Sequence, residues 1–331
     1  TVEYTTDGQS VNLIYSDSTK GWIPLEDDVV ADEPEAPTTQ KGIFAFGDSP
    51  DDTFHNVSNL VSSSGVVATD TTGVGTARTF LGAASYGGDK AIYAYGASGD
   101  GNVSLSNLVS NSGVVASDVT GVGTARNGVG AAGYGGDKAI FAYGYDGSND
   151  VSVSNLANNS GVIASDVTGV GTIRNYVSAT GYGVDLAIFA YGNGSSNNRL
   201  STSNLVNNSG VVGSDVSGVG SARQGTAACR FGGDKAIFAY GVNTSSANIN
   251  VRNLVSNQGV IADDASGAGT ARRYLAATNY GGDKGIFAYG HTNARVSMSN
   301  LISNSGVVAS DTTGVGQTRE GCEGAGFSYS A

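Results

Sequence analysis

Two histidines and two nearby acids are the side chains whose types best fit metal or polar-ligand chemistry. His55 and His291 are the only histidines, and Asp51 and Asp52 lie just before His55. Imidazole nitrogens and carboxylates bind metal ions, and both hydrogen-bond polar ligands. A fold that joined positions 55 and 291 could form a metal or glycan site. We favour the alternative, two solvated loop histidines, so we expect no metal and no cofactor.

Other catalytic patterns are weak. Neither Cys229 nor Cys322 has a histidine near it that suits a nucleophilic triad. No carboxylate pair of the glycosidase type is evident, and the Gly-Val-Gly strings lack the helix and the Lys-Ser/Thr of a phosphate loop. Residues 146–150 only faintly resemble a calcium loop. The sequence therefore predicts that the protein is not an enzyme.

Charge argues against two classes of partner. The net charge is −12, and residues 1–40 hold nine acids and one base. Nonspecific nucleic-acid binding needs a basic surface, and an anionic membrane repels an acidic one. No apolar run approaches the ~20 residues that span a bilayer. We expect no nucleic-acid partner and no membrane insertion.

The elements that must position these side chains come from an internal repeat. Three strings recur about every 48 residues over 41–331, so six units fill that range. Lys-Ala/Gly-Ile-Phe/Tyr-Ala-Tyr/Phe-Gly starts at Lys41, Lys90, Lys138, Lys235 and Lys284, with a variant at Leu186. The asparagine of Ser-Asn-Leu (Arg-Asn-Leu in the fifth unit) is Asn59, Asn107, Asn155, Asn204, Asn253 or Asn300. An arginine stands eight residues after an aspartate at Arg78, Arg126, Arg174, Arg223, Arg272 and Arg319.

Each unit is predicted to contain four short strands. In the second unit they are 129–135, 138–144, 151–157 and 161–166, with a tight Gly-Gly-Asp turn between the first two. Apolar residues alternate with small ones, which indicates strands and not helices. Four strands in 40–50 residues, repeated radially, are typical of a β-propeller blade. The alternative is a β-solenoid, whose rung is usually shorter.

The phase of the repeat predicts how the ring closes. The array opens at Lys41 with a second strand, and 324–330 at its end match a first strand. The C-terminus would thus complete blade 1. We predict an all-β fold: a β-segment (1–23), an acidic linker with prolines (24–40) and a six-bladed β-propeller (41–331).

The repeats resemble known families. Arg126, the small residues of 131–136 and the aromatic strand 138–144 resemble a kelch repeat, although the usual tryptophan is absent and the paired glycines are displaced. Gly-Asp-Lys-Ala-Ile-Phe-Ala-Tyr-Gly and Asn-Leu-Val-Ser-Asn-Ser-Gly-Val-Val-Ala-Ser-Asp are similar to kelch-like arrays in virion proteins of tailed bacteriophages, notably marine ones. Residues 8–23 resemble a β-segment that ends trimeric stalks in phage tail fibres.

This resemblance implies a phage virion appendage, a tail fibre or spike, whose head binds a host-surface glycan or protein. It would sit in the virion with other virion proteins. The alternatives are a structural or decoration protein of the virion, a bacterial surface adhesin, and a carbohydrate-active enzyme.

Comparing the repeats separates scaffold from site. We expect the six arginines to form interblade salt bridges or bonds to carbonyls; the alternative is a cationic ring that holds an anion. The repeated asparagines should be turn residues that bond the backbone. The loops between second and third strands differ most between units, as binding loops do. They are 48–56, 97–102, 145–150, 193–199, 242–248 and 291–295. Their candidate receptor-binding residues are Phe54, His55, Tyr145, Asn149, Arg199, His291 and Arg295.

Two further expectations concern assembly and redox state. The N-terminal segment is too short to bury its own apolar residues, so we expect a homo-oligomer, most plausibly a trimeric stalk. Blade 6 should separate Cys229 from Cys322, so we expect two free thiols.

Overall fold

The computed structural model describes residues 12–19, 21–26 and 40–328. The chain divides into two units, Thr1–Thr38 and Thr39–Ala331. In the described ranges the regular elements are β-strands, apart from one 3-10 turn at Ser195–Asn197, and no helix there is long and apolar enough to cross a membrane. Pro24 was expected to open a linker but lies in a strand that continues to Glu26, and 27–39 lie outside the described residues.

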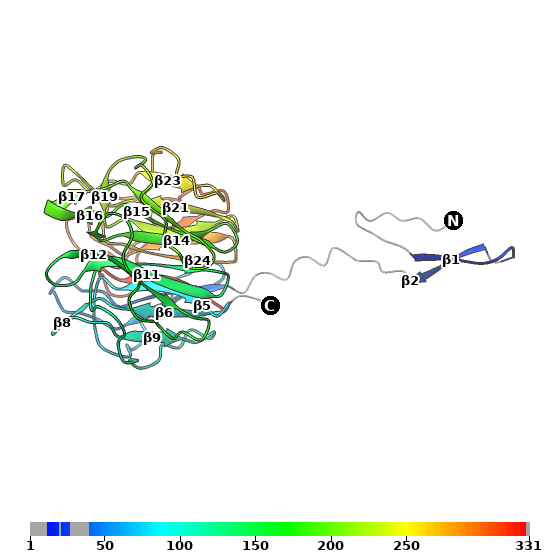
Figure 1. The fold of residues 1–331 in the computed structure, drawn as a ribbon, viewed down its shortest axis with the longest axis horizontal. Coiled ribbons are helices and arrows are strands. Elements are labelled where there is room, and N and C mark those ends of the chain that lie inside the picture. Colours follow the sequence, from blue (N-terminus) through cyan, green and yellow to red (C-terminus); the bar gives the residue numbers. More distant parts are fainter. Residues whose placement is uncertain (1–11, 20, 27–39, 329–331) are drawn as a thin grey trace. The chain divides into compact units, whose positions relative to one another are not determined.

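The described part of the first unit is one hairpin. Strands β1 (Asn12–Asp17) and β2 (Gly21–Glu26) are antiparallel, with Tyr15 opposite Trp22 (Figure 1). The two rings meet edge to face at 5.5 Å between centroids. Trp22 is nevertheless 66% exposed, because a two-stranded hairpin offers no second layer to cover it.

The described part of the second unit contains six three-stranded antiparallel sheets with the same internal order and three small sheets of two-residue strands (Figure 1). The small sheets are formed by β7 (Ala97–Ser98), β8 (Gly101–Asn102), β13 (Arg174–Asn175), β16 (Asn193–Gly194), β17 (Asn198–Arg199), β19 (Arg223–Gln224) and β22 (Val242–Asn243). The first strands are β5 (Gly82–Tyr86), β10 (Gly130–Tyr134), β14 (Ser178–Tyr182), β20 (Ala227–Phe231), β24 (Ala276–Tyr280) and β27 (Glu323–Phe327). The second strands are β6 (Lys90–Ala94), β11 (Lys138–Tyr145), β15 (Leu186–Ala190), β21 (Lys235–Ala239), β25 (Lys284–Ala288) and β3 (Lys41–Ala45). The third strands are β9 (Ser106–Val109), β12 (Asp150–Ala157), β18 (Ser203–Val206), β23 (Arg252–Val255), β26 (Ser299–Ile302) and β4 (Ser58–Val61).

The expected fourth strand is reduced to two isolated bridges in each repeat. After β12 these bridges join Ala157 to Ile163 and Ser154 to Val167. Between them the Asn155 side chain donates to the Ala164 carbonyl at 3.0 Å. The Asn155 amide thus occupies the Ala164 carbonyl, a backbone acceptor that a strand pairing would otherwise use. A continuous strand over 161–166 therefore does not form.

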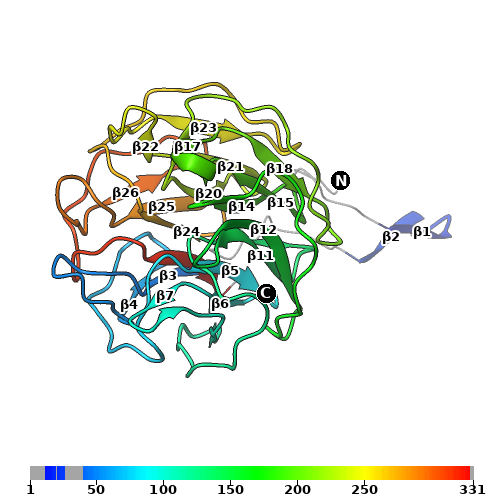
Figure 2. The ribbon, with the colours of Figure 1, turned by 60° about the vertical axis from the view of Figure 1, so that its left-hand side comes forward.

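The two ends of the repeat array pair with each other, as the repeat phase predicts. β27 is antiparallel to β3, with Ala325 opposite Ile43 and Phe327 opposite Lys41 (Figure 2). The observed strand begins one residue before the expected one. The six first strands also neighbour one another in chain order, and β27 neighbours β5, so the cycle of sheets returns to its start.

Packing between sheets explains why first strands are small and second strands aromatic. In β11, Ile140 and Phe141 are fully buried, and Phe141 lies against β5 of the preceding sheet. A side chain on Gly82 would crowd Phe141 and Ala131. Small residues therefore let the aromatic layer of one sheet approach the next. Cys229 and Cys322 are both buried and free, as expected.

The unit has two distinct faces. The loop face contains the loops between second and third strands and the segments that follow the six arginines. These segments pair with the loops through β-bridges, as Thr79 does with Ala97 and Arg273 does with His291. The turn face contains the turns between first and second strands, where Gly87 donates to the Asp137 carbonyl of the next turn at 2.7 Å. Gln40 also bonds Gly281 and Gly282 on the turn face, so the chain enters there.

Candidate binding face

The six repeated arginines belong to the scaffold. All are fully buried, and each guanidinium stacks on an aromatic ring of the preceding sheet, at 4.0 Å from the ring centroid for Arg126 over Tyr95. Arg126 also donates to the carbonyls of Tyr143 and Thr124 and to the Asn155 side chain. The expectation of salt bridges and carbonyl bonds is confirmed, and a ring of cations open to an anion is not formed.

Five of the six arginines form an ion pair with an aspartate of the following repeat. Arg78 lies 3.7 Å from Asp118, and Arg319 lies 3.8 Å from Asp70 across the closure. Burial lowers the pKa of Arg78 to about 10, with Asp118 opposing the shift, so the group keeps its charge at neutral pH. These pairs bind consecutive sheets together.

The repeated asparagines are also structural and bond the backbone as expected, as Asn107 does to the Ala116 carbonyl at 2.9 Å, but they lie in strands and not in turns. Asn59 and Asn107 lie inside third strands and are fully buried. Asn107 accepts from Arg78 at 2.6 Å and donates to Asp118 at 2.9 Å. An amide offers a donor and an acceptor at once, which suits a position between a cation and an anion.

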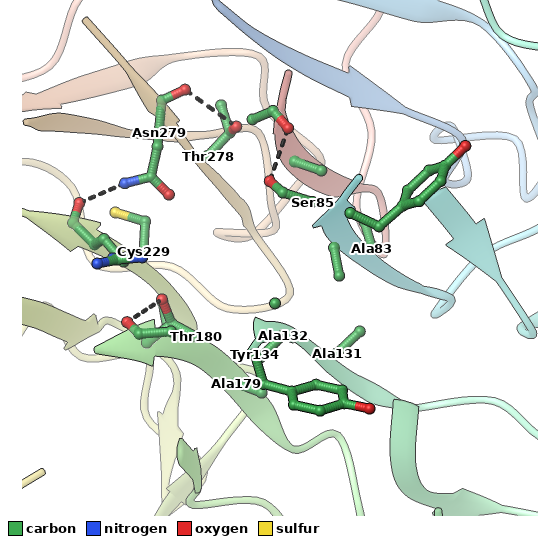
Figure 3. Close-up of a pocket in the computed structure, with 18 of the residues that line it drawn as sticks. Ala83, Ser85, Ala131, Ala132, Tyr134, Ala179, Thr180, Cys229, Thr278 and Asn279 are labelled. Carbon is green, nitrogen blue, oxygen red and sulfur yellow. Dashed lines mark hydrogen bonds between the residues drawn. The ribbon is translucent and has the colours of Figure 1, made fainter. Parts of the chain in front are cut away.

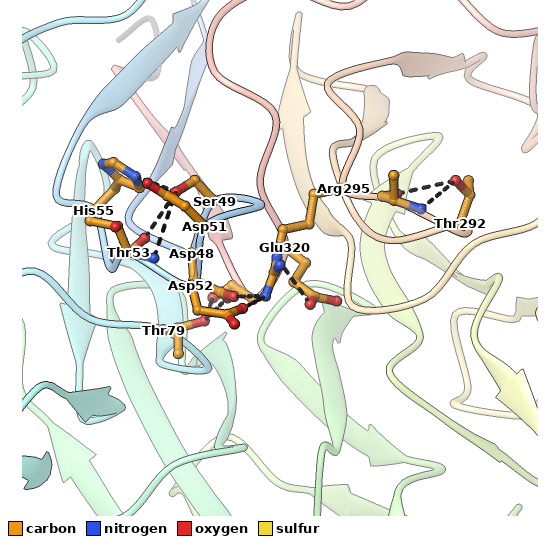
Figure 4. Close-up of polar contacts among 12 residues, drawn as sticks. Asp48, Ser49, Asp51, Asp52, Thr53, His55, Thr79, Thr292, Arg295 and Glu320 are labelled. Carbon is orange, nitrogen blue, oxygen red and sulfur yellow. Dashed lines mark hydrogen bonds and ion pairs between the residues drawn. The ribbon is translucent and has the colours of Figure 1, made fainter.

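On the loop face, Arg295 joins the first and sixth repeats. Its guanidinium contacts Asp48 and Asp52 of the first loop and lies 3.2 Å from Glu320 (Figure 4). Burial and the neighbouring Asp48 raise the pKa of Glu320 to about 7, although Arg295 opposes the shift. The loops of the first and sixth repeats therefore meet, as closure requires.

The structure does not join the two histidines in one site. His55 contacts Ser49 at 2.8 Å and Gln317 at 3.0 Å, on the other side of the first loop from Arg295 (Figure 4). His291 pairs through its backbone with Arg273 and Arg295. Burial, with Arg273, lowers the pKa of His291. Within the described ranges no group of three or more His, Cys, Asp or Glu could hold a metal ion.

The other candidate residues are spread around the loop face. Phe54 is half-buried and forms an isolated backbone β-bridge with Asp48. The Tyr145 hydroxyl donates to the Gly147 carbonyl at 2.9 Å. Asn149 is exposed at a turn where its backbone NH bonds Asp146 at 2.8 Å. Arg199 is partly buried beside Asn193. Their role in binding stays a prediction.

The sequence analysis missed an aromatic cluster at the centre of the loop face. Phe80, Tyr176 and Tyr274 meet one another with ring centroids 5.0–5.2 Å apart. Each stands two residues after a repeated arginine, where the intervening repeats have Gly128, Gly225 and Gly321. Backbone bonds link this ring of positions, as from the Gly128 NH to the Phe80 carbonyl at 2.8 Å. The alternation of aromatic residue and glycine is visible in the sequence and could have identified the cluster.

Beneath the cluster, an axial space runs between the first strands. Its wider part, about 250 Å³, is lined by small residues and by polar ones such as Ser85, Thr180 and Asn279 (Figure 3). Nearer the aromatic cluster, Glu323 lines two smaller spaces of about 30 Å³ each. Burial raises the pKa of Glu323 to about 8.

Comparison with known proteins gives no relative. No model of a known protein family matches the chain, and no curated protein is significantly similar to it. The geometry of the chain itself therefore carries the proposal that follows.

Proposed function

We propose that the second unit is a closed six-bladed β-propeller of kelch-like layout that serves as a non-catalytic recognition head. The six equivalent sheets, the cycle of first strands and the pairing of β27 with β3 support this architecture. A ring closed by strands from both ends of the array has no open sheet edge in its inner layer, which suits a rigid platform for loops.

One observation carries the functional proposal: repeated polar residues are used inside the scaffold, whereas the non-repeated ones gather on the loop face. The arginines, asparagines and aspartates of the repeat bond one another within and between sheets. The segments that differ between repeats, such as 48–56 and 291–295, lie together on the opposite face from Gln40, where the chain enters. A ligand approaching the loop face would thus meet the variable residues.

The resemblance of the repeats to phage virion arrays supplies the biological setting. We propose that the protein is part of a tail fibre or spike and that the loop face binds a glycan or protein on the host surface. The alternatives are a structural or decoration protein of the virion, which requires no ligand-selective loop face, and a bacterial surface adhesin.

A second candidate, a carbohydrate-active enzyme, is favoured by Glu320. Its pKa of about 7 suits a general acid, and Asp48 is a neighbouring carboxylate. Both carboxylates, however, contact the same arginine, Arg295, which holds them in a structural ion cluster. We therefore favour recognition over turnover.

The full chain on an array of bacterial surface polysaccharides tests this proposal. We expect selective binding and no release of shorter sugars. Alanine at Phe54, His55, His291 and Arg295 should weaken binding at least about ten-fold, while alanine at the turn-face residues Lys90, Lys138, Lys235 and Lys284 should not.

Three results would overturn it. They are the absence of binding both to any polysaccharide and to bacterial surface proteins, catalytic cleavage of a bound polysaccharide, and equal binding by the loop-face variant when its melting temperature shows that it is folded.

A further inference from the structure

The centre of the loop face carries strain that the fold does not require. Phe80, Tyr176 and Tyr274 have φ values of 52°, 49° and 53°, in the left-handed region. Glycine takes this conformation freely and does so at the equivalent positions of the other three repeats, whereas an L-residue is strained there. The rings that stack on the arginines, such as Tyr95 and Tyr143, also have positive φ, but an aromatic stands there in every repeat. Aromatic residues that alternate with glycine are not required by the repeat and therefore point to a use for the rings themselves.

The three rings form a partly accessible apolar patch. Each residue is neither fully buried nor exposed; Phe80 meets both tyrosines edge to face, and the two tyrosine rings are tilted at 51° to each other. Gln224 donates to the Tyr274 hydroxyl at 2.7 Å and so fixes one ring. The patch is thus a small, rigid aromatic surface at the axis, surrounded by the six loops.

Unpartnered oxygens surround this patch. The residue between each arginine and the axial position varies between repeats, apart from asparagine at both 127 and 175. In three repeats it carries a buried oxygen with no hydrogen-bond partner among the described residues: Asn175 Oδ1, Gln224 Oε1 and Glu320 Oε2. A buried acceptor without a partner is unfavourable. Each of the three can accept a hydrogen bond, Glu320 when it is ionised, so a ligand that donates hydrogens would satisfy them.

We propose that this axial patch, formed by Phe80, Tyr176, Tyr274, Asn175, Gln224 and Glu320, binds a pyranose ring of a neutral or amino sugar. The apolar face of the sugar would stack on the rings, and its hydroxyl or ammonium hydrogens would reach the acceptors after small side-chain rotations. Burial and the neighbouring Tyr274 raise the pKa of Tyr176, and the carboxylates Glu320, Asp150 and Asp48 add to the shift. Although Arg273 lies 5.6 Å from the centroid of the Tyr274 ring, three carboxylates near Tyr176 disfavour an acidic sugar. This inference rests on the proposed function and names its ligand class.

Saturation-transfer NMR on the full chain with methyl glucoside, methyl galactoside, methyl mannoside, N-acetylglucosamine, glucosamine and glucuronic acid tests the inference. At least one neutral or amino sugar should bind in the millimolar range, and glucuronic acid should not. Tyr176→Gly should weaken binding at least ten-fold while keeping the backbone, because Gly128 and Gly225 occupy the equivalent positions. Gln224→Ala should also weaken it, and Lys138→Ala on the turn face should leave it unchanged.

The outcomes separate this inference from the proposed function. No binding to any of the six sugars, preferred binding of glucuronic acid, or wild-type binding by folded Tyr176→Gly and Gln224→Ala variants would overturn the axial site. If polysaccharide binding on the array is then still lost in the Phe54, His55, His291 and Arg295 variant, the proposed function stands without it. If neither experiment shows binding, and bacterial surface proteins do not bind either, both fail.

Discussion

At the residue scale, the buried arginines make the strongest energetic prediction. Arg223 stacks on Tyr191 at 4.0 Å, bonds Asn253 at 2.6 Å and lies 3.6 Å from Asp264. Arg223→Ala removes the packing on Tyr191 and leaves the buried Asn253 oxygen without its donor, so urea unfolding should show a loss of about 2–5 kcal/mol in the free energy of unfolding.

Lys235→Ala is the control, because Lys235 is half-exposed beside Asp234 and its loss should change stability by less than about 0.5 kcal/mol. Equal stability of the two variants would contradict the scaffold role of the arginines.

Glu323 makes a pH-dependent prediction. Burial raises its pKa from 4.5 to about 8, so between these values the folded chain holds a proton that the unfolded chain has lost. Stability contributed by this group therefore falls as pH rises from about 4.5 to 8. Ala227 and Ala276 occupy the equivalent position in other sheets, so Glu323→Ala should raise Tm by about 2–6 °C at pH 9 and leave it unchanged near pH 4.

Asp100→Ala, at an exposed loop position, should show no such pH-dependent gain. A Glu323→Ala variant whose Tm difference from wild type is the same at pH 4 and pH 9 would show that Glu323 is not a buried acid.

How far single residues were predictable depended on whether they repeat. Arg78 and Asn107 recur in every unit, so comparison within the chain identified them as scaffold, although the strand position of Asn107 was wrong. Arg295 and Glu320 occur once, and their contact depends on ring closure and loop conformation, which no local pattern specifies. Tyr176 was missed although glycine stands at the equivalent positions 128 and 225, because the comparison of repeats was limited to residues that recur and to the loops between second and third strands.

At the element scale, the closing strand is the part most open to test. β27 is the only partner of β3 on its inner side, and Ser85 on β5 donates to the Gly326 carbonyl at 2.7 Å. Deleting 321–331 should leave the edge of β3 unpaired, lower Tm by roughly 10 °C or more and cause aggregation, as measured by scanning calorimetry and gel filtration.

Deletion of 329–331 alone keeps all of β27 and should behave as wild type. Unchanged melting and a monodisperse profile for the longer deletion would show that the ends of the array do not hold each other.

Strand positions were predictable because the alternation of apolar and small residues, and the glycines that form the turns, are features of the local sequence. Gly135 and Gly136, both at positive φ, set the turn between β10 and β11, and the sequence located both strands to within about two residues. The fourth strand was overestimated because Asn155 competes for its backbone, an effect that apolar alternation cannot reveal.

At the scale of the whole molecule, the N-terminal hairpin predicts self-association. Ile14, Tyr15 and Trp22 are 49%, 55% and 66% exposed in a unit that has no other described layer to cover them. Light scattering on the full chain should give an oligomer, with three copies expected from the stalk resemblance. Trp22→Ser with Ile14→Ser should shift it toward monomer, whereas Val114→Ser, an equally exposed residue of the second unit, should not.

A strictly monomeric full chain at high micromolar concentration would contradict this prediction, since the exposed side chains would then need no partner.

The central claim is that a ligand binds the loop face of a closed ring of sheets. Hydrogen-exchange mass spectrometry with the polysaccharide that binds best on the array tests it without any mutation. We predict slower exchange in 48–56, 174–176, 272–275 and 291–295, with turns 87–89, 135–137 and 232–234 unchanged. Protection confined to those turns, or no protection at a saturating concentration, would contradict the account.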